Sequence, residues 1–453
     1  MNSLDLIVRG GRVVTSESVT AADIGVAEGK IVMIAPEMEG EAAEVIDASG
    51  LHVFPGAIDA HVHFNEPGRT DWEGIETGSR AVAAGGGTMF FDMPLNAHPP
   101  TIDAASFQAK RAAAEQSSLV DFALWGGLVP QNLDKLEELA ECGVIGFKAF
   151  MCNSGINDFP FVRDDILREG MQRAARLGLP VAVHAESESM TACLTAEAAS
   201  AHRTGIRDFL DSRPIQAELN AIQRAIALAA ETACALHVVH VSCAAGVRLI
   251  AAAHRAGVNV TCETCPHYLT LSEDDLARLG AAAKCAPPLR SAHERDELWR
   301  ELLAGNILTI GSDHSPSPPA MKQAADFFKV WGGISGAQHL LPLLLTLGHF
   351  VRRADLPFLS RSCSANVAWR FNLPEGKGRV AEGSDADLAL VNLHETFVVH
   401  AEDLQYRHRQ TPYLGRRLHG AVKRTLVRGR TVFLNGKAVA EPQGRLIKPT
   451  RPG

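Results

Sequence analysis

The 453-residue chain contains no apolar run close to the about 18 consecutive residues that a membrane-spanning helix needs. Its first residues lack the basic start and the apolar stretch of a secretory signal peptide. It also lacks a basic excess: the formal net charge is −8, whereas phosphate binding requires a basic surface. We therefore expect a soluble cytoplasmic protein that binds neither membrane nor nucleic acid.

The cysteines lack the spacing of a disulfide framework. All nine are scattered along the chain, which suits a reducing compartment. One CxxC pair, Cys262 to Cys265, has no second pair to complete a zinc site. We interpret it as small residues on a buried strand, with a zinc or redox site as the alternative.

The hydrophobic fraction of 46% is enough for a packed interior, and no low-complexity tract interrupts it. Both ends of the chain read as short apolar runs divided by turns, such as the hairpin turn predicted at Glu28-Gly29-Lys30. We predict that residues 1–54 and 372–453 pair into one small β-sandwich domain, beside a larger domain of residues 55–371.

In the larger segment, short apolar runs alternate with longer helical stretches, which indicates repeated βα units. The predicted helices include Asp103–Gln116, Asp164–Leu177, Ile215–Thr232 and His293–Leu303. The predicted strands are Ala57–Phe64, Thr88–Met93, Asp121–Trp125, Gly146–Phe150, Val181–Glu186, Leu236–Val241, Asn259–Cys265 and Leu308–Ser312. Eight such units form an α/β fold, a (β/α)8 TIM-like barrel, with its active site at the carboxyl ends of the strands.

Polar side chains stand at the ends of these predicted strands. His61 and His63 lie on one strand, where alternate residues face the same side. Further polar groups end other apolar strands: Lys148, His184, His240 and Asp313. Because unpaired buried polar groups cost several kcal/mol, a shared metal centre is favoured over separately satisfied residues. Four histidines and a carboxylate suit zinc or another divalent first-row metal.

The run from Gly56 to His63, followed in order by these polar residues, resembles the amidohydrolase superfamily over essentially the whole chain. It is most similar to the cyclic-amidase branch, which holds allantoinase, dihydropyrimidinase (hydantoinase) and dihydroorotase. The resemblance implies one divalent ion on His61, His63 and Asp313, and a second on His184 and His240. Lys148 would bridge the two ions as N6-carboxylysine. Zinc is expected, and cobalt, manganese, nickel or iron are the alternatives.

Two departures bear on the ring that is cleaved. Dihydroorotases carry an arginine two residues after the HxH pair, where this chain has Asn65. Hydantoinases usually place a tyrosine five residues after the bridging lysine, where this chain has Asn153. Several runs resemble allantoinases instead: Asn65–Thr70, Trp72–Gly74, Asp92–Asn96, Phe147–Phe150, Lys284–Pro288, Asp313–Pro316 and Lys329–Ser335.

The resemblance implies hydrolysis of a ring amide of allantoin to allantoate in purine breakdown, with Asp313 as the group that transfers the proton. Backbone groups at Ala286 and Gly332 would hold the ring, with Asn96, Asn153 and Ser315 as further contacts. The two asparagines are equally explained as turn or capping residues. His267 and His314 are interpreted as structural or supporting residues.

A dihydropyrimidinase or hydantoinase with a broad pocket is the main alternative. A non-catalytic scaffold on the same barrel is the other, but such proteins have typically lost metal ligands that are all present here. The expected partner is a small cyclic amide or ureide. By the same resemblance, the chain is expected to form a homo-oligomer, a tetramer or a dimer.

Overall fold

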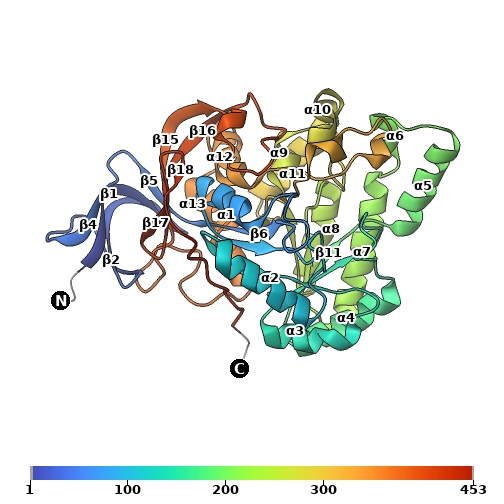
Figure 1. Ribbon diagram of the computed structural model, residues 1–453, viewed down its shortest axis with the longest axis horizontal. Helices are drawn as coiled ribbons and strands as arrows, with labels where there is room; N and C mark the ends of the chain where they lie inside the picture. The colour runs from blue at the N-terminus through green and yellow to red at the C-terminus, as the bar shows by residue number, and fades with distance from the viewer. Residues whose placement is uncertain (1–3, 451–453) are drawn as a thin grey trace.

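The computed structural model describes residues 4–450. A β-rich part lies at the N-terminal end of the molecule and joins a larger part in which helices surround parallel strands (Figure 1). Among the described residues, no helix combines the length and the apolar character that crossing a membrane requires.

The larger part is a barrel of parallel strands, as the sequence predicts. Its strands are β6 (Ala57–Val62), β7 (Gly87–Asp92), β8 (Asp121–Leu124), β9 (Gly126–Gly127), β10 (Phe147–Phe150), β11 (Val181–His184), β12 (Leu236–Val238), β13 (Val260–Thr264) and β14 (Thr309–Ile310). They form a three-stranded sheet, β6-β7-β8, and a six-stranded sheet, β9 to β14. The two sheets meet where Trp125 separates β8 from β9 and where a parallel bridge joins Val62 to His314.

Several barrel strands end earlier than predicted. The strand predicted to reach Val241 ends at Val238, two residues before His240, whose φ is 43°. The strand predicted to reach Ser312 ends at Ile310, and Asp313 has a φ of 45°. A residue with positive φ cannot continue a β ladder, so the backbone leaves the sheet just where these side chains enter the site.

The four helices named from the sequence are confirmed as α2 (Ala104–Ser117), α4 (Asp164–Arg176), α7 (Ile215–Thr232) and α11 (Ala292–Leu303). Asp103 caps α2 by accepting a hydrogen bond from the Ser106 N–H at 2.8 Å. The other α-helices are α1 (Ile75–Ala84), α3 (Leu136–Cys142), α5 (Glu188–Ser200), α6 (Ile206–Asp211), α8 (Ala244–Arg255), α9 (Pro266–Thr270), α10 (Glu273–Leu279), α12 (Leu340–Leu344), α13 (Leu356–Ser362) and α14 (Ala365–Arg370).

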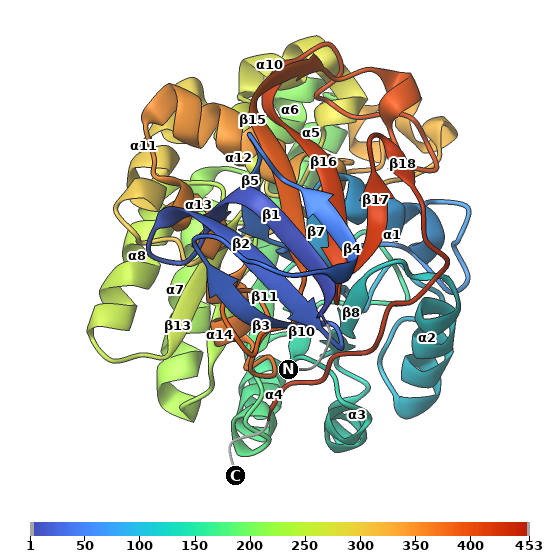
Figure 2. The same cartoon turned by 90° about the vertical axis from the view of Figure 1, so that its left-hand side faces the viewer.

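Strands from both ends of the chain join in one nine-stranded sheet, seen face-on in Figure 2. They are β1 (Leu4–Val14), β2 (Val19–Ala27), β3 (Lys30–Ala35), β4 (Ala42–Asp47), β5 (His52–Pro55), β15 (Leu388–Val398), β16 (Arg417–Val427), β17 (Arg430–Leu434) and β18 (Lys437–Ala438). The two ends meet where β5 pairs antiparallel with β15, with Val53 opposite Leu390. The predicted pairing of the two ends is therefore confirmed, and the division at residues 54 and 372 stays a prediction.

The predicted hairpin turn is present between β2 and β3. Ala27 pairs with Lys30, and the two residues between them, Glu28 and Gly29, have φ values of 52° and 76°. Two consecutive positive φ angles define a type I′ turn, whose twist matches that of the paired strands.

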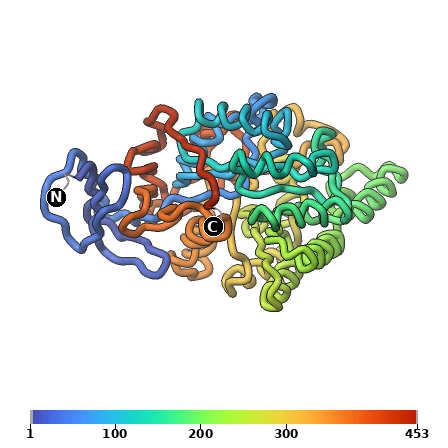
Figure 3. The backbone as a smooth tube through the Cα atoms, turned by 90° about the horizontal axis from the view of Figure 1, so that it is seen from below, coloured from blue at the N-terminus to red at the C-terminus, as the bar shows by residue number. Residues whose placement is uncertain are grey.

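The segment after β18 leaves the nine-stranded sheet and lies on the barrel. Phe122 of β8 donates to the Arg445 carbonyl at 3.0 Å, and Ile447 donates back to the Phe122 carbonyl at 2.8 Å. Figure 3 shows the N-terminal strands at one end of an elongated molecule and the C-terminal end of the chain near its middle. No pattern in the sequence predicts this return.

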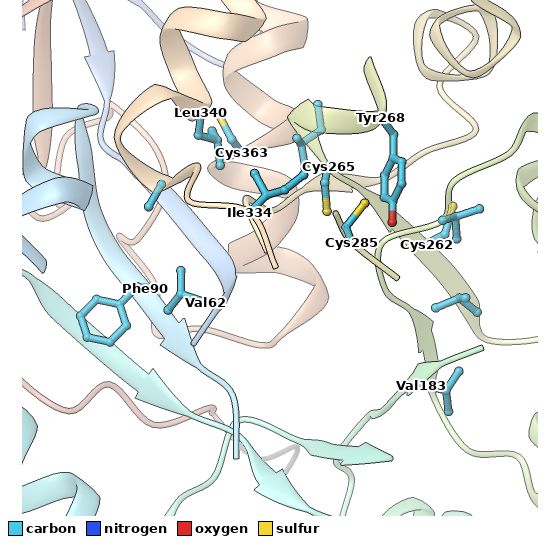
Figure 4. Close-up of a cluster of buried hydrophobic side chains, with 14 of the residues drawn as sticks. Val62, Phe90, Val183, Cys262, Cys265, Tyr268, Cys285, Ile334, Leu340 and Cys363 are labelled. Carbon is cyan, nitrogen blue, oxygen red and sulfur yellow. The ribbon is translucent and has the colours of Figure 1, made fainter. Parts of the chain in front are cut away.

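The CxxC cysteines belong to the barrel core. Cys262 and Cys265 are buried free thiols of a hydrophobic cluster that also holds Cys285 (Figure 4). Burial raises the pKa of Cys262 to about 12, so this thiol stays protonated at neutral pH. The interpretation as small residues on and beside a buried strand fits this position.

One buried cation joins the barrel to the nine-stranded sheet. The Nζ of Lys377 donates to Asp121 of β8 and to Asp387 just before β15, at 2.7 Å in each case. Asp385 lies 3.0 Å away, and neighbouring Arg428 also donates to Asp121. Burial alone would lower the pKa of Lys377, but the three carboxylates raise it above its usual range.

Replacing this cation should destabilise the fold. In Lys377→Met, three carboxylates lose their common partner, and removing one member of a buried ion pair costs about 3–5 kcal/mol. Lys30→Met is the matched control, because Lys30 pairs with the same Asp385 at 2.9 Å with 53% of its side chain exposed, and exposed pairs contribute about 0.2–1 kcal/mol. Urea unfolding of both variants measures the difference; equal midpoints would contradict a structural role for Lys377.

Candidate metal centre

His61 and His63 come from the end of β6, and their side chains point to the same side of the strand. The Nε2 atoms of both lie close to one carboxylate oxygen of Asp313, at 3.3 Å and 3.4 Å. One ligand atom of each residue lies within 4.8 Å of the others. Strand alternation and barrel closure thus bring together three of the predicted ligands, although Asp313 follows His63 by 250 residues in the sequence.

His184 and His240 converge on the same centre from β11 and the residues after β12. The Nδ1 of His184 lies 3.1 Å from the Nε2 of His240. The His240 ring is also 5.4 Å from the His61 ring, centroid to centroid. All four predicted histidines therefore surround one small volume.

Lys148 lies on β10 beneath these imidazoles and is fully buried. Its Nζ has no hydrogen-bond partner among the described residues and lies 5.2 Å from the centroid of the Phe150 ring. Burial lowers the pKa of Lys148 to about 8. Burying an amine without a hydrogen-bond acceptor costs free energy. The Nζ of Lys148 is therefore expected to bind a further group.

The protonation states suit a cation. Burial lowers the pKa of His61 and of His240 well below the usual range, so both imidazoles are neutral. Burial alone would raise the pKa of Asp313, but His61 and the hydrogen bond from His63 hold it well below the usual range. Neutral imidazoles and an ionised carboxylate are the forms in which these residues bind metals. The buried Nδ1 atoms of His63 and His240 have no hydrogen-bond partner among residues 4–450.

A cavity of about 660 Å³ lies above the histidines, at the carboxyl ends of the barrel strands. All five residues predicted to contact substrate line it, together with the four histidines and Asp313. They are Asn96, Asn153, Ala286, Ser315 and Gly332.

The family model described as "Amidohydrolase family" matches residues 52–432. The chain belongs to the amidohydrolase family. An allantoinase of Rubrobacter xylanophilus is 57% identical over 451 residues, covering 100% of this chain and 99% of the relative. An allantoinase of Deinococcus radiodurans is 52% identical, covering 99% of each. The solved L-hydantoinase (dihydropyrimidinase) of Arthrobacter aurescens superposes with a TM-score of 0.96 at 36% identity, covering 98% of this chain and 100% of that one.

The asparagines of this amidohydrolase have local roles as well as cavity positions. The Asn153 Oδ1 accepts a hydrogen bond from the Gly155 N–H at 2.9 Å, which makes a turn. Asn96 has a φ of 69°, and its carbonyl accepts from Arg69 at 3.0 Å. Both therefore act as turn residues, and their side-chain amide nitrogens have no protein partner among residues 4–450.

His314 and His267 of the amidohydrolase lie outside the ligand cluster. The His314 Nδ1 accepts from the Gly336 N–H at 3.1 Å, and its Nε2 faces Glu73 at 3.6 Å. The His267 ring packs 4.2 Å from the Tyr268 ring, centroid to centroid. These positions fit the interpretation as structural or supporting residues.

Two supporting carboxylates were missed in the sequence. Glu263 of β13 has an oxygen 2.9 Å from the His61 Nδ1, and both side chains are 1% exposed. Glu186 lies 2.8 Å from the His184 Nε2 and accepts from Arg213 at 2.6 Å. Burial alone would raise the pKa of Glu186, but Arg213 lowers it to about 2. The available signal was a carboxylate within a predicted apolar strand, the same signal that pointed to His184.

Glu186 also groups with Cys152 and His184, whose ligand atoms lie within 4.8 Å of one another. Burial raises the pKa of the Cys152 thiol far above its usual range, whereas a cysteine ligand must be a thiolate. Glu186 is already bound to Arg213. This second group therefore orients His184 and is a weaker cation site than His61, His63 and Asp313.

Glu263→Gln should weaken metal retention by about 10–100-fold, because a carboxylate on Nδ1 fixes the His61 ring and leaves Nε2 free to bind. The measurement is the rate at which a chelator removes metal from the loaded protein. Glu301→Gln is the control: Glu301 is a buried glutamate on α11 that accepts from Arg248 at 2.6 Å. If both variants released metal like the parent, the proposed role of Glu263 would be wrong.

Proposed function

We propose that this amidohydrolase hydrolyses a ring amide bond of allantoin and releases allantoate, a step in purine breakdown. One observation carries the chemistry: four histidines, an ionised aspartate and a buried lysine without a partner among residues 4–450 converge at the base of one cavity. The choice of ring rests on the full-length likeness to proteins named allantoinase.

We propose that His61, His63 and Asp313 hold one divalent ion and that His184 and His240 hold the second, with zinc as the first choice and cobalt, manganese, nickel or iron as alternatives. Lys148 would join them as N6-carboxylysine, formed when its neutral amine adds carbon dioxide and loses a proton. The buried, partnerless Nζ supports this assignment. When bound, the ions would lower the pKa of a water molecule and polarise the amide carbonyl.

Asp313 is proposed as the residue that moves the proton. Its ionised carboxylate faces the cavity between His61 and His63, so it can accept a proton from the attacking water. When the carbon–nitrogen bond of the ring breaks, the same carboxyl group returns the proton to the leaving nitrogen. The water oxygen remains in the carboxylate of the product, and no covalent acyl-enzyme is needed.

Backbone groups of two residues in the cavity wall are proposed to hold the ring. The N–H and C=O groups of Ala286 and of Gly332 line the cavity and have no protein partner within residues 4–450. The side chains of Asn96, Asn153 and Ser315 would complete the contacts.

A dihydropyrimidinase or hydantoinase is the second candidate, favoured by the superposition on the Arthrobacter aurescens enzyme. It would share the centre and differ in the cavity walls. The scaffold alternative has no support, because all six residues predicted as ligands are present and converge.

We also propose a homo-oligomer, a dimer or a tetramer. The cytoplasm is the proposed compartment, supported by the free cysteines.

Metal-reconstituted protein is expected to open allantoin faster than hydantoin, dihydrouracil or dihydroorotate. Asp313→Asn should lower kcat for allantoin by about 10²–10⁴-fold, because it removes the group that transfers the proton. The measurement is product formation across this panel. Preference for hydantoin or dihydrouracil would favour the second candidate function. No turnover of any of the four rings would contradict both candidate functions.

Lys148→Ala should lose the capacity for a second metal ion, because the bridging carboxylate disappears with the amine. In the unmodified chain, uptake of the second ion by stripped protein should depend on added bicarbonate. Elemental analysis with and without bicarbonate measures both effects. Full uptake of two ions by Lys148→Ala would exclude the bridging role.

A further inference from the structure

Lys284, which lines the cavity, and Lys322 both donate hydrogen bonds to backbone carbonyls of one segment. The Nζ of Lys284, a residue only 4% exposed, donates to the carbonyls of Phe327 and Val330 at 2.6 Å in each case. It also lies 4.5 Å from the centroid of the Phe209 ring. The Nζ of Lys322 donates to the carbonyls of Gly333 at 2.7 Å and Trp331 at 2.9 Å.

These two lysine side chains bind the backbone carbonyls of five of the seven residues in the segment 327–333, here called the tryptophan loop. The Trp331 N–H donates to the Met321 carbonyl at 2.9 Å, and the Gly333 N–H donates to the Lys284 carbonyl at 2.7 Å. Within the part of the chain that the structure describes, Gly332 keeps both its N–H and its C=O without a protein partner. A Cβ added at Gly332 would meet open space, which places this residue at the cavity.

Peptide geometry determines where the two free groups point. In a trans peptide the C=O and the following N–H point in opposite directions. Because Lys322 holds the Trp331 carbonyl, the Gly332 N–H points away from Lys322. Because the Lys284 carbonyl holds the Gly333 N–H, the Gly332 C=O points away from Lys284. Both free groups of Gly332 therefore point away from the lysine atoms that bind the neighbouring peptide groups.

The loop is also tightly seated beside Asp313. Gly333 has a φ of 141°, and a Cβ there would lie 2.1 Å from the Ser315 carbonyl oxygen, so no other residue fits. Asp313, the proposed proton-transfer group, lies two residues before Ser315. A displacement of the tryptophan loop would therefore move the Gly332 peptide groups relative to Asp313.

We propose that Lys284 and Lys322 are positioning residues that aim the N–H and C=O of Gly332 at the ring amide of the substrate. A ring forces its amide to be cis, so the amide N–H and C=O lie along one edge of the ring. One residue that offers both a donor and an acceptor can pair with that edge, as opposed residues do in an antiparallel sheet. This inference rests on the proposed function.

The test uses Lys284→Met and Lys322→Met, which keep the aliphatic stem and remove the ammonium group. Lys329→Met is the control, because Lys329 is on the same loop, 77% of its side chain is exposed, and within residues 4–450 its one ion pair is with Asp326, at 3.7 Å. Metal content and melting temperature are measured first. With metal content unchanged, kcat/KM for allantoin should fall about 100-fold in the first two variants, since a shift of about 1 Å costs that much.

Substrate methylation separates positioning from general weakening. The unmodified chain should discriminate strongly against allantoin methylated at the ring nitrogen that pairs with Gly332, so the N1-methyl and N3-methyl compounds are both assayed. This discrimination should shrink in Lys284→Met and Lys322→Met and return in Lys322→Arg, which restores a cation. Wild-type discrimination in both methionine variants, or loss of metal in proportion to activity, would overturn the proposal.

The two failures remain distinguishable. If the unmodified chain does not open allantoin, the proposed function is wrong, and the same variants are assayed on whichever panel ring it does open. If it opens allantoin and the lysine variants match Lys329→Met, only the positioning role is wrong. A methionine variant that melts far below its parent is replaced in the comparison by Lys322→Gln or Lys284→Gln, which also removes the cation, and wild-type discrimination in the glutamine variant would overturn the proposal.

Discussion

The backbone N–H of His63 donates to the His314 carbonyl at 2.7 Å, and there the first and last strands of the barrel meet. The adjoining bridge between Val62 and His314 closes the sheet. Without this closure, the HxH pair and Asp313 would lie on two open edges. These contacts between residues far apart in the sequence bring His61, His63 and Asp313 together at the cavity.

Closure also sets the electrostatics. A barrel interior is normally filled by branched apolar side chains, yet here it encloses imidazoles, a lysine and carboxylates. Burial suppresses the charge of His61 and His240 while Asp313 stays ionised. Glu263 and Glu186 hold the outer nitrogens of His61 and His184. These hydrogen bonds orient the two imidazole rings, as catalysis by preorganised polar groups requires.

The order of strands and helices could be read from the sequence, because it depends on periodicity, and α7 was predicted with its observed bounds. The six residues of the proposed metal centre could be singled out because each is a polar residue that interrupts an apolar run, and their role as ligands stays a prediction. The carboxylates that contact these histidines could not be found in this way. Glu263 lies 202 residues from His61, and only the closed barrel places one against the other. The early strand ends at His240 and Asp313 were missed for a related reason, since their positive φ values are imposed by tertiary contacts. The return of residues 445–447 to β8 has no periodic signal at all.

The pairing of β5 with β15 has a consequence for synthesis. The entire barrel sequence lies between these two strands, so the N-terminal strands leave the ribosome long before their partner exists. During that interval β5 presents an unpaired edge, the kind of surface that recruits other chains. Domains generally fold in the order of synthesis, but here the sheet that begins earliest can be completed only after the whole barrel sequence has been made.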